Sequence, residues 1–391
     1  MTTTDTLNRQ GGWFDLLTSG YVITGGDVGG YHGESDAIVS KTSDGADLNE
    51  LYGQFRDVLK IWNDNLDTLV NLISYRTVSP AEYLLQSADG ARMEKASEFG
   101  VPKGVKNEPA TIVGFDFEDY DIATRWSYRF LRSASKAQVQ SSFDNILSGH
   151  NKAVVSAVLQ RLFNNSPVIT PEGNQAVGLW AGDMKPPSHL GKTFAADHNH
   201  YLVSGATSVD SEDIEGLQNI VTEHGYGKTQ GSQLLLLCND VEAEKIASYR
   251  AGVVSANTKV AKYDFIPSSS APAYLTDKTI VGSVAPGELS GLEVIGSYGR
   301  LWVVPHSAVP EGYLSVVASA GANSAANPIG FREHYDEAHR GLKLVPGNWQ
   351  GYPLIESLGY AGFGCGTRHR GAAAVMQIKA SGSYEVPTIA L

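Results

Sequence analysis

Residues 136–163 read KAQVQSSFDNILSGHNKAVVSAVLQRLF, and this stretch decides the fold. Its apolar residues recur at three- and four-residue steps, which places them on one broad stripe of an α-helix that Ser135 can cap. At 1.5 Å per residue the helix is roughly 40 Å long, well above the globular average, so it can act as the backbone of the molecule. Gly149 costs this helix about 1 kcal/mol relative to alanine, and we expect a bend there.

A second amphipathic helix is predicted upstream, from about Asp47 to Tyr75, with Asp47 as its N-cap. Residues 1–45 mix glycine pairs with isolated apolar residues, a pattern too sparse for a core of its own. We therefore expect an extended arm that lies on something else. Its glycine pairs neither follow a clear strand nor lead into a helix, so they indicate hinges and not a dinucleotide or phosphate loop.

Between the two helices, the segment from about Glu82 to Tyr128 contains few apolar side chains and is broken up by charges, glycine and proline. Asp89-Gly90 is a strong turn signal between two candidate strands, so the pattern predicts a long, protruding, two-stranded loop. A structureless excursion of this length does not fit inside a compact domain. We therefore expect the loop to find its partners on a neighbouring molecule.

The second half of the chain has the pattern of an α/β lobe. Helices are predicted from Ser211 to near Gly225 or Gly227 and from Val241 to Tyr249, on either side of a strand at Gln233–Asn239. Glycine clusters from Tyr360 to Gly371, which indicates turns and flexible backbone. The remaining predicted strands are Thr279–Val284, Leu292–Ile295, Leu301–Pro305, Tyr313–Ser319, Ala372–Ile378 and Tyr384–Ile389.

The composition excludes several classes of protein. A chain of 391 residues with 42% hydrophobic content can bury a large core, and its length favours two or three lobes. The 30 basic and 42 acidic residues give a net charge of −12, which does not fit a dedicated nucleic-acid binder. The longest purely apolar run, Leu234–Cys238, is strand-sized, far short of the roughly 20 residues that a membrane-spanning helix needs.

The termini and cysteines indicate where the protein resides. Met1–Gln10 lacks the pattern of a secretory signal, so we expect the protein to stay where it is made. Cys238 and Cys365 are too few for a disulfide framework and wrongly spaced for a zinc cluster. We expect both to be reduced cysteines of a cytoplasmic product.

One candidate metal group is the densest cluster of ligand-type side chains, formed by Glu333, His334, Asp336, Glu337 and His339. The five-residue spacing from His334 to His339 would put the two rings on different faces of a helix, unlike the four-residue spacing of a zinc-protease helix. A solvated or interfacial charge cluster is therefore the favoured interpretation.

A second candidate metal group is the pair His198 and His200, beside Asp197, which can chelate from one face of a strand. The sequence shows no third or fourth ligand for this pair. Turn histidines are therefore the favoured interpretation, and no metal is expected.

Motifs for nucleophilic catalysis are absent from the sequence. It has no Gly-x-Ser-x-Gly elbow, and Cys365 lies too close along the chain to His369 to suggest a papain-like pair. Arg368 and Arg370 form a short basic patch that can touch phosphate, but pairing with the surplus acids of this chain is the favoured interpretation. We predict no catalytic, cofactor-binding or metal-binding residue and no cofactor, and therefore no enzyme.

The order of these elements resembles the major capsid proteins of tailed bacteriophages with the Hong Kong 97-type fold. Ala134–Asn165 looks like the spine helix of that family, and Glu82–Tyr128 looks like its extended loop, which overlaps a neighbouring subunit. The segment from Leu292 to Tyr313 is similar to the strand, surface crossing and proline-x-glycine turn of the axial domain. The segment from Gly351 to Val375 resembles the closing strands of the peripheral domain.

The resemblance covers nearly the whole chain and implies an α+β fold of several parts. The implied layout is an N-terminal arm at 1–46, a first helix region at 47–81, an extended loop at 82–128, a peripheral domain with the spine helix at 129–210, an axial domain at 211–330, and a return to the peripheral domain with the closing strands at 331–391.

Some members of this family join subunits through a lysine in the extended loop, an asparagine in a neighbour and a catalytic glutamate. Lys95, Lys103 and Lys106 lie in the loop region and Asn348 precedes the closing segment, but no spacing singles them out, so crosslinking is not predicted. The scaffolding segment that often precedes the first helix in this family has no counterpart here. A separate scaffolding protein is the resulting hypothesis.

The resemblance implies a virion protein that self-assembles into the pentamers and hexamers of an icosahedral head, built in the host cytoplasm around double-stranded DNA that it binds without sequence specificity. Scaffolding, portal and decoration proteins are its implied partners, and no membrane is involved. The nearest alternative is the shell of an encapsulin-like nanocompartment, which houses cargo enzymes. An alternative from another class is a metal-dependent hydrolase that uses His334, His339 and the nearby carboxylates.

Overall fold

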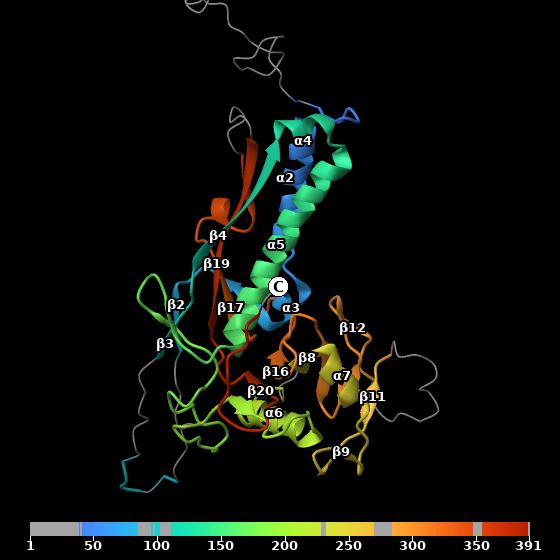
Figure 1. Ribbon diagram of the computed structural model, residues 1–391. Helices are drawn as coiled ribbons and strands as arrows, with labels where there is room; N and C mark the ends of the chain where they lie inside the picture. Colours follow the sequence, from blue (N-terminus) through green and yellow to red (C-terminus); the bar gives the residue numbers. More distant parts are fainter. Residues whose placement is uncertain are drawn as a thin grey trace, which may run out of the picture.

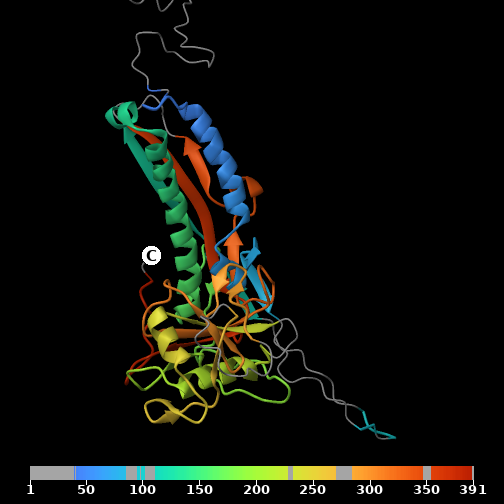
Figure 2. The ribbon, with the colours of Figure 1, turned by 90° about the vertical axis from the view of Figure 1, so that its right-hand side faces the viewer.

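The computed structural model describes residues 39, 41–84, 95–96, 98–101, 111–227, 232–269, 284–346 and 354–389. In this described part the fold is mixed α and β and has two main parts (Figure 1). We call them the elongated unit, in which long helices lie on a five-stranded sheet, and the compact lobe, which is built on a seven-stranded sheet. A view at a right angle shows the elongated unit standing on the compact lobe as a slab (Figure 2).

The elongated unit contains four helices and one sheet. The helices are α2 (Leu48–Asp64), α3 (Thr68–Ile73), α4 (Tyr128–Ser133) and α5 (Lys136–Phe163). The sheet has the order β1 (Ser74–Thr77), β17 (Ile329–Glu333), β19 (Leu354–Thr367) and β18 (Lys343–Pro346), with β4 (Glu118–Ser127) also paired to β19.

The compact lobe has helices α6 (Ser211–Glu223) and α7 (Asp240–Ala247). Its sheet has the order β11 (Phe265–Pro267), β14 (Gly296–Tyr298), β15 (Leu301–Pro305), β8 (Gln233–Cys238), β16 (Tyr313–Ser319), β20 (Ala373–Gln377) and β7 (Tyr201–Val203). Smaller elements are the pairs β2–β3 (Ala81–Leu84, Thr111–Gly114), β5–β6 (Val168–Ile169, Gln175–Ala176), β9–β10 (Val254–Ala256, Lys259–Val260) and β12–β13 (Glu288–Leu289, Leu292–Glu293), and the 3-10 turn η2 (Glu337–His339).

The long helix predicted from the sequence is confirmed as α5. Ser135 caps it through a capping box, in which its side chain accepts from the Gln138 amide while the Gln138 side chain accepts from the Ser135 amide. The helix runs unbroken through Gly149, where a Cβ atom would lie 3.0 Å from Cδ1 of Ile122 on β4. The glycine at this position therefore gives the sheet room to approach the helix closely.

The single upstream helix predicted from Asp47 to Tyr75 is wrong in one respect, because two helices occupy this segment. The chain leaves the helical conformation at Asn65, and Asp67 then caps α3 by accepting a hydrogen bond from the Leu69 amide. The predicted cap Asp47 is confirmed, since it accepts from the Asn49 amide at 2.8 Å.

Strand β19 corrects the interpretation of the glycine cluster, because Tyr360–Thr367 is continuous strand and not turns. A Cβ atom at Gly359 would lie 2.9 Å from Ile146 of α5, and one at Gly364 would collide with the Asp116 carbonyl. The glycines therefore sit where other segments cross the strand closely, a known reason for glycine in a strand interior.

Residues 118–127 were expected in the protruding loop, but they form β4 and pair antiparallel with β19 along its length, from Glu118↔Phe363 to Ser127↔Leu354. A strand that gains a full ladder and packs under α5 is more stable there than in an isolated ribbon. Of the expected loop, the structure describes the hairpin β2–β3 and residues 95–96 and 98–101. The expected turn Asp89-Gly90 lies outside the described residues.

Two segments expected in the peripheral domain belong to the sheet of the compact lobe. β20 pairs with β16 and β7 pairs with β20, so the chain enters this sheet before 211 and again after 331. The strand predicted at Tyr384–Ile389 does not form, because these residues pack against α5 through side chains. Tyr384, for example, donates to the Phe163 carbonyl at 2.7 Å.

The other predicted elements of the lobe are largely confirmed. The strands at Leu301–Pro305 and Tyr313–Ser319 have the predicted bounds, whereas the segment Leu292–Ile295 is divided between β13 and the residues leading into β14. Most of the strand predicted at Thr279–Val284 lies outside the described residues. Among the helices that are described, none combines the length and the apolar character needed to cross a membrane.

Burial of strand β8 explains how the two parts are joined. Its residues 234–238 are all buried because both faces of the sheet are covered. Leu235 and Leu237 belong to the core shared with α5, while Leu234, Leu236 and Cys238 belong to the core of the compact lobe. One face of the seven-stranded sheet therefore packs against the elongated unit, and the other face packs against the helices of the compact lobe.

Two glycine substitutions should change stability in opposite directions. Gly364→Ala should lower the free energy of unfolding by about 1–3 kcal/mol, since the added methyl group meets backbone that cannot move away cheaply. Gly53→Ala, on the open face of α2 where a Cβ meets nothing within 4 Å, should raise it by about 0.5–1 kcal/mol. Chemical denaturation of the unassembled subunit checks both, and an equal effect of the two would contradict the assigned role of Gly364.

Candidate assembly surfaces

The hairpin β2–β3 projects from the side of the molecule (Figure 1). Its two strands pair antiparallel from Ala81↔Gly114 to Leu84↔Thr111, and Tyr83 stands directly opposite Ile112 on the outward face. Tyr83 is 74% exposed and Ile112 is also exposed, whereas Val113 on the opposite face is buried against the body. One face of the hairpin thus offers an apolar cross-strand pair to a partner.

The described residues at 98–101, beyond the hairpin, carry apolar side chains into solvent. Phe99 is 91% exposed and Val101 is 93% exposed. The segment, teal in both views, lies far from the elongated unit and from the compact lobe (Figures 1 and 2). Two exposed apolar side chains so far from the rest of the fold are typical of a surface that is buried in an assembly.

The base of the hairpin is fixed to the body by charge. Glu82 forms an ion pair with Arg368, at 3.1 Å between Oε2 and Nε, and accepts from the Tyr75 hydroxyl at 3.4 Å. This ion pair confirms the interpretation of Arg368 as a partner for surplus acid.

Arg370 is likewise paired. Its side chain, only 4% exposed, donates to both carboxylate oxygens of Asp183 at 2.7 and 2.8 Å and to the carbonyls of Gly178 and Leu179. Its guanidinium also lies 4.2 Å from the centre of the Trp180 ring. Burial raises the pKa of Asp183, but the hydrogen bonds and charge of Arg370 outweigh burial and hold that pKa below its usual value.

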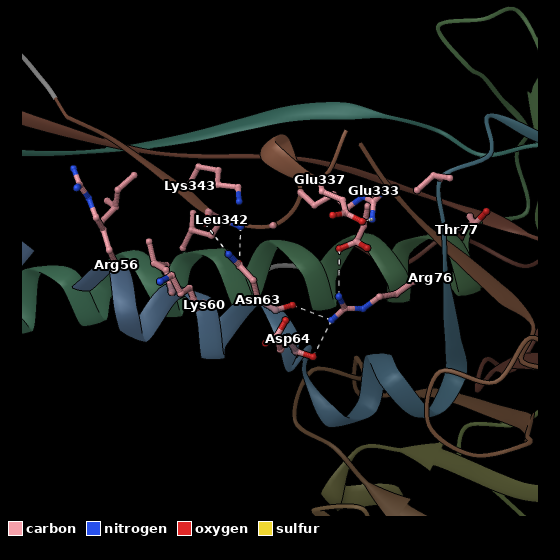
Figure 3. A pocket seen from close by; sticks show the side chains of 15 residues that line it. Arg56, Lys60, Asn63, Asp64, Arg76, Thr77, Glu333, Glu337, Leu342 and Lys343 are labelled. Carbon is pink, nitrogen blue, oxygen red and sulfur yellow. Dashed lines mark hydrogen bonds and ion pairs between the residues drawn. The ribbon is translucent and has the colours of Figure 1, made fainter. Parts of the chain in front are cut away.

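A groove of about 1150 Å³ lies between α2, β1 and the segment from η2 to β18 (Figure 3). Five cationic side chains and three carboxylates line it, which makes its lining basic in a chain whose net charge is −12. The lining charges are Arg56, Lys60, Arg76, Arg340, Lys343, Asp64, Glu333 and Glu337.

The walls of the groove are held together by Asn63 and Arg76. Asn63 exchanges two hydrogen bonds with the backbone of Leu342, at 3.0 and 2.8 Å. Arg76 donates to the carbonyls of Asn63 and Asp64 and pairs with Glu333 at 3.6 Å, as the dashed lines in Figure 3 show. The groove is therefore a preformed second candidate contact surface, next to the elongated sheet.

The cluster Glu333 to His339 does not form a metal site among the described residues, since no third ligand atom joins its two histidines. The segment is a strand end and a 3-10 turn instead of the helix considered earlier, and the rings of His334 and His339 come within 5.1 Å between centroids. Glu333 is engaged by Arg76. The hydrolase interpretation therefore lacks a ligand set in this part of the molecule.

The pair His198 and His200 does gain a third histidine, His224. The three Nε2 atoms lie 3.0 to 3.1 Å from one another. His224 was missed because it follows a different element, α6, and nothing in the local sequence links it to positions 198 and 200. The sequence indicated only that His198 and His200, two residues apart, can lie on the same face of a strand.

Comparison with solved structures decides the family. The chain aligns over 90% of its length with 93% of a protein from Mycobacterium phage Patience, at 37% identity and a TM-score of 0.70. The chain belongs to the major capsid proteins of tailed bacteriophages. The fold class predicted from the order of elements, the Hong Kong 97-type capsid fold, is thereby confirmed.

Other solved structures are similar to this capsid protein at lower sequence identity and TM-score. The capsid of a native GTA particle aligns with 80% of the chain, over 91% of its own length, at 11% identity and a TM-score of 0.49. An encapsulin complex from Synechococcus elongatus aligns with 82% of the chain, over 90% of its own length, at 10% identity and a TM-score of 0.44. A scan against protein-family models and a search of curated proteins give no match.

The ion pair between the buried Arg370 and Asp183 of this capsid protein can be tested at Arg370. Arg370→Lys should lower the free energy of unfolding by about 1–3 kcal/mol. The single ammonium of lysine cannot replace both Nη2, which bonds Asp183 and the Leu179 carbonyl, and Nε, which bonds the Gly178 carbonyl. Lys60→Gln, which removes an exposed ion pair with Asp57, is the control and should have little effect. Urea unfolding curves of the two variants measure the difference, and equal curves would refute the structural role of Arg370.

Proposed function

We propose that this capsid protein builds pentamers and hexamers that close into an icosahedral head around double-stranded DNA. The virion is then its location, after assembly in the host cytoplasm. In this proposal the compact lobe is the axial domain and the elongated unit is the peripheral domain. A scaffolding protein, a portal protein and a decoration protein are the further partners, and the role of the chain is structural instead of catalytic.

The observation that carries the proposal is the projecting hairpin with its apolar side chains. Phe99 and Val101 are almost fully exposed, and Tyr83 and Ile112 form an outward apolar pair, so burial against a neighbour would stabilise a lattice contact. Burying one such side chain contributes roughly 1.5–3 kcal/mol. The contribution is modest for one contact but recurs at every subunit of a closed shell.

The charge of the chain supports a passive relation to the genome. At a net charge of −12 the chain as a whole repels a polyanion, which allows DNA to be enclosed without being bound along its length. Sequence-specific readout would require a basic surface presented to a groove of the duplex. The DNA is therefore enclosed by the shell and is not recognised by its sequence.

Electron microscopy of the expressed protein, with its scaffolding protein supplied, tests the function. We expect closed shells, or tubes and sheets of hexamers, because each of these is a product of a lattice-forming subunit. A stable monomer or small oligomer under the same conditions would contradict the proposal.

The role of the loop is tested with the double variant Phe99→Ser and Val101→Ser. Each lattice contact should weaken by about tenfold or more, since a loss of 1.4 kcal/mol corresponds to tenfold, so the critical concentration for assembly should rise. The melting temperature of the subunit should stay the same because both side chains are exposed within it. Light scattering during assembly gives the critical concentration.

The matched control is Phe99→Leu with Val101→Ile, which keeps both positions apolar and should assemble as the wild type does. Assembly of the serine variant at the wild-type concentration would show that these side chains are not buried in the lattice. It would leave the shell function to be judged by the microscopy alone.

A further inference from the structure

Three histidine side chains from two segments of the chain meet beside strand β7 at the edge of the compact lobe's sheet. His198 and His200 precede strand β7, and His224 is the C-cap residue of α6. Their Nε2 atoms form a nearly equilateral triangle, with 3.1 Å from His198 to His200, 3.0 Å from His198 to His224 and 3.1 Å from His200 to His224. In the part of the chain that the structure describes, this is the one group of three or more ligand-type side chains with such geometry.

The orientation of the His200 ring is fixed by a hydrogen bond to the backbone. Its Nδ1 atom lies 2.6 Å from the carbonyl of Ala373, so Nδ1 carries the proton and donates it, and Nε2 turns a lone pair toward the other two rings. A histidine that donates one ring N–H to a carbonyl and offers the other nitrogen is the usual arrangement of a metal ligand. The ring is fully buried.

His224 is also held in place by its surroundings. Its ring stacks on Phe194, with 4.0 Å between centroids and 15° between planes. A Cβ atom at Gly371 would lie 2.9 Å from Cγ of His224, so glycine at this position leaves the ring its space. The ring is thus clamped between an aromatic face and backbone.

Hydrogen bonding alone cannot satisfy the three nitrogens. Each Nε2 is either a donor or an acceptor, and among three mutually adjacent atoms of two kinds at least two must be alike. Two donors or two lone pairs then face each other at 3.0 to 3.1 Å. A cation that accepts three lone pairs at once removes this conflict.

The triangle has the size of a three-histidine metal site. At metal–nitrogen distances of about 2.0–2.1 Å, an ion equally far from the three atoms lies about 1 Å outside their plane, with a fourth position left for water. A neutral imidazole is the form that binds metal ions. Imidazole ligands suit zinc, copper, iron and nickel.

We propose that His198, His200 and His224 bind a divalent transition-metal ion of the zinc class. The ion would hold the segment that ends at His200 against the C-terminal end of α6. The segment from Asn164 to His200 has only the two-residue strands β5 and β6 and isolated bridges such as Ala181↔Asn199, so little ladder bonding holds it. The ion would join the end of this segment to α6, and the ion pair of Arg370 with Asp183 joins its middle to the residues before β20.

The proposal is tested by metal analysis of untagged protein, because an affinity tag of histidines would bind metal itself. After chelator treatment and dialysis, Zn²⁺ should return to about one ion per subunit, and Co²⁺ should give the intense visible absorption of a four-coordinate site with nitrogen ligands. Bound Zn²⁺ should raise the melting temperature, since it binds the folded state.

His198→Ala is the informative variant, because His198 is only partly buried and its loss should leave the fold intact. We expect its Zn²⁺ affinity to fall by about 100-fold or more, beyond the effect of losing an outer partner of a metal ligand, and the cobalt spectrum to vanish. The matched control replaces His334 and His339 with alanine and should bind the ion as the wild type does.

Two outcomes would overturn the site. Wild-type protein that binds Zn²⁺ no better than His198→Ala would show that the three rings form a packed cluster without an ion. Loss of binding in the His334 and His339 control would show that the bound metal is held by the surface cluster. These measurements work on free subunits as well as on shells, so they are independent of the assembly proposal.

Discussion

The packing of helix α5 onto strand β19 is the interaction on which the rest of the structure depends. The helix lies along the strand, and Ile146 fits against Gly359, where any side chain would keep the two apart. β19 in turn carries β4 on one side and β17 and β18 on the other. Because each neighbour takes its register from this one strand, its glycines decide how closely helix, strand and crossing segment can approach. The result is a slab whose core continues into the sheet of the compact lobe through Leu235 and Leu237 of β8.

How much the sequence could predict follows from how local each signal is. Neighbouring residues alone determine some elements, namely the helix 136–163 and the strands Leu301–Pro305 and Tyr313–Ser319. The predicted bounds of these three elements were correct. The place of β4 depends on a ladder with residues more than 200 positions away, and the glycines of β19 are explained only by what crosses them. His224 joins His198 and His200 through the fold alone, so the third ligand could not be found from spacing.

The elongated unit and the compact lobe differ from the hairpin β2–β3 in how much of their apolar surface is buried within the subunit. The elongated unit and the compact lobe share a core through β8, whose alternating leucines face one part or the other. The hairpin β2–β3 contributes Val113 to the body but presents Tyr83 and Ile112 to solvent. A shell subunit needs this combination, since a body that is stable before assembly can present projections whose stability comes from its neighbours. The groove beside α2 is preformed in the same sense, held by Asn63 and Arg76.

Amide hydrogen exchange, compared between the free subunit and the assembled shell, tests most directly whether the projections are completed by neighbours. We expect slow exchange of the α5 and β19 amides in both states, because their hydrogen bonds lie in the shared core. The hairpin amides, in a two-stranded ladder that is only marginally stable alone, should exchange quickly in the free subunit and become protected in the shell. Equal protection of the hairpin in both states, or protection of α5 only after assembly, would contradict the account.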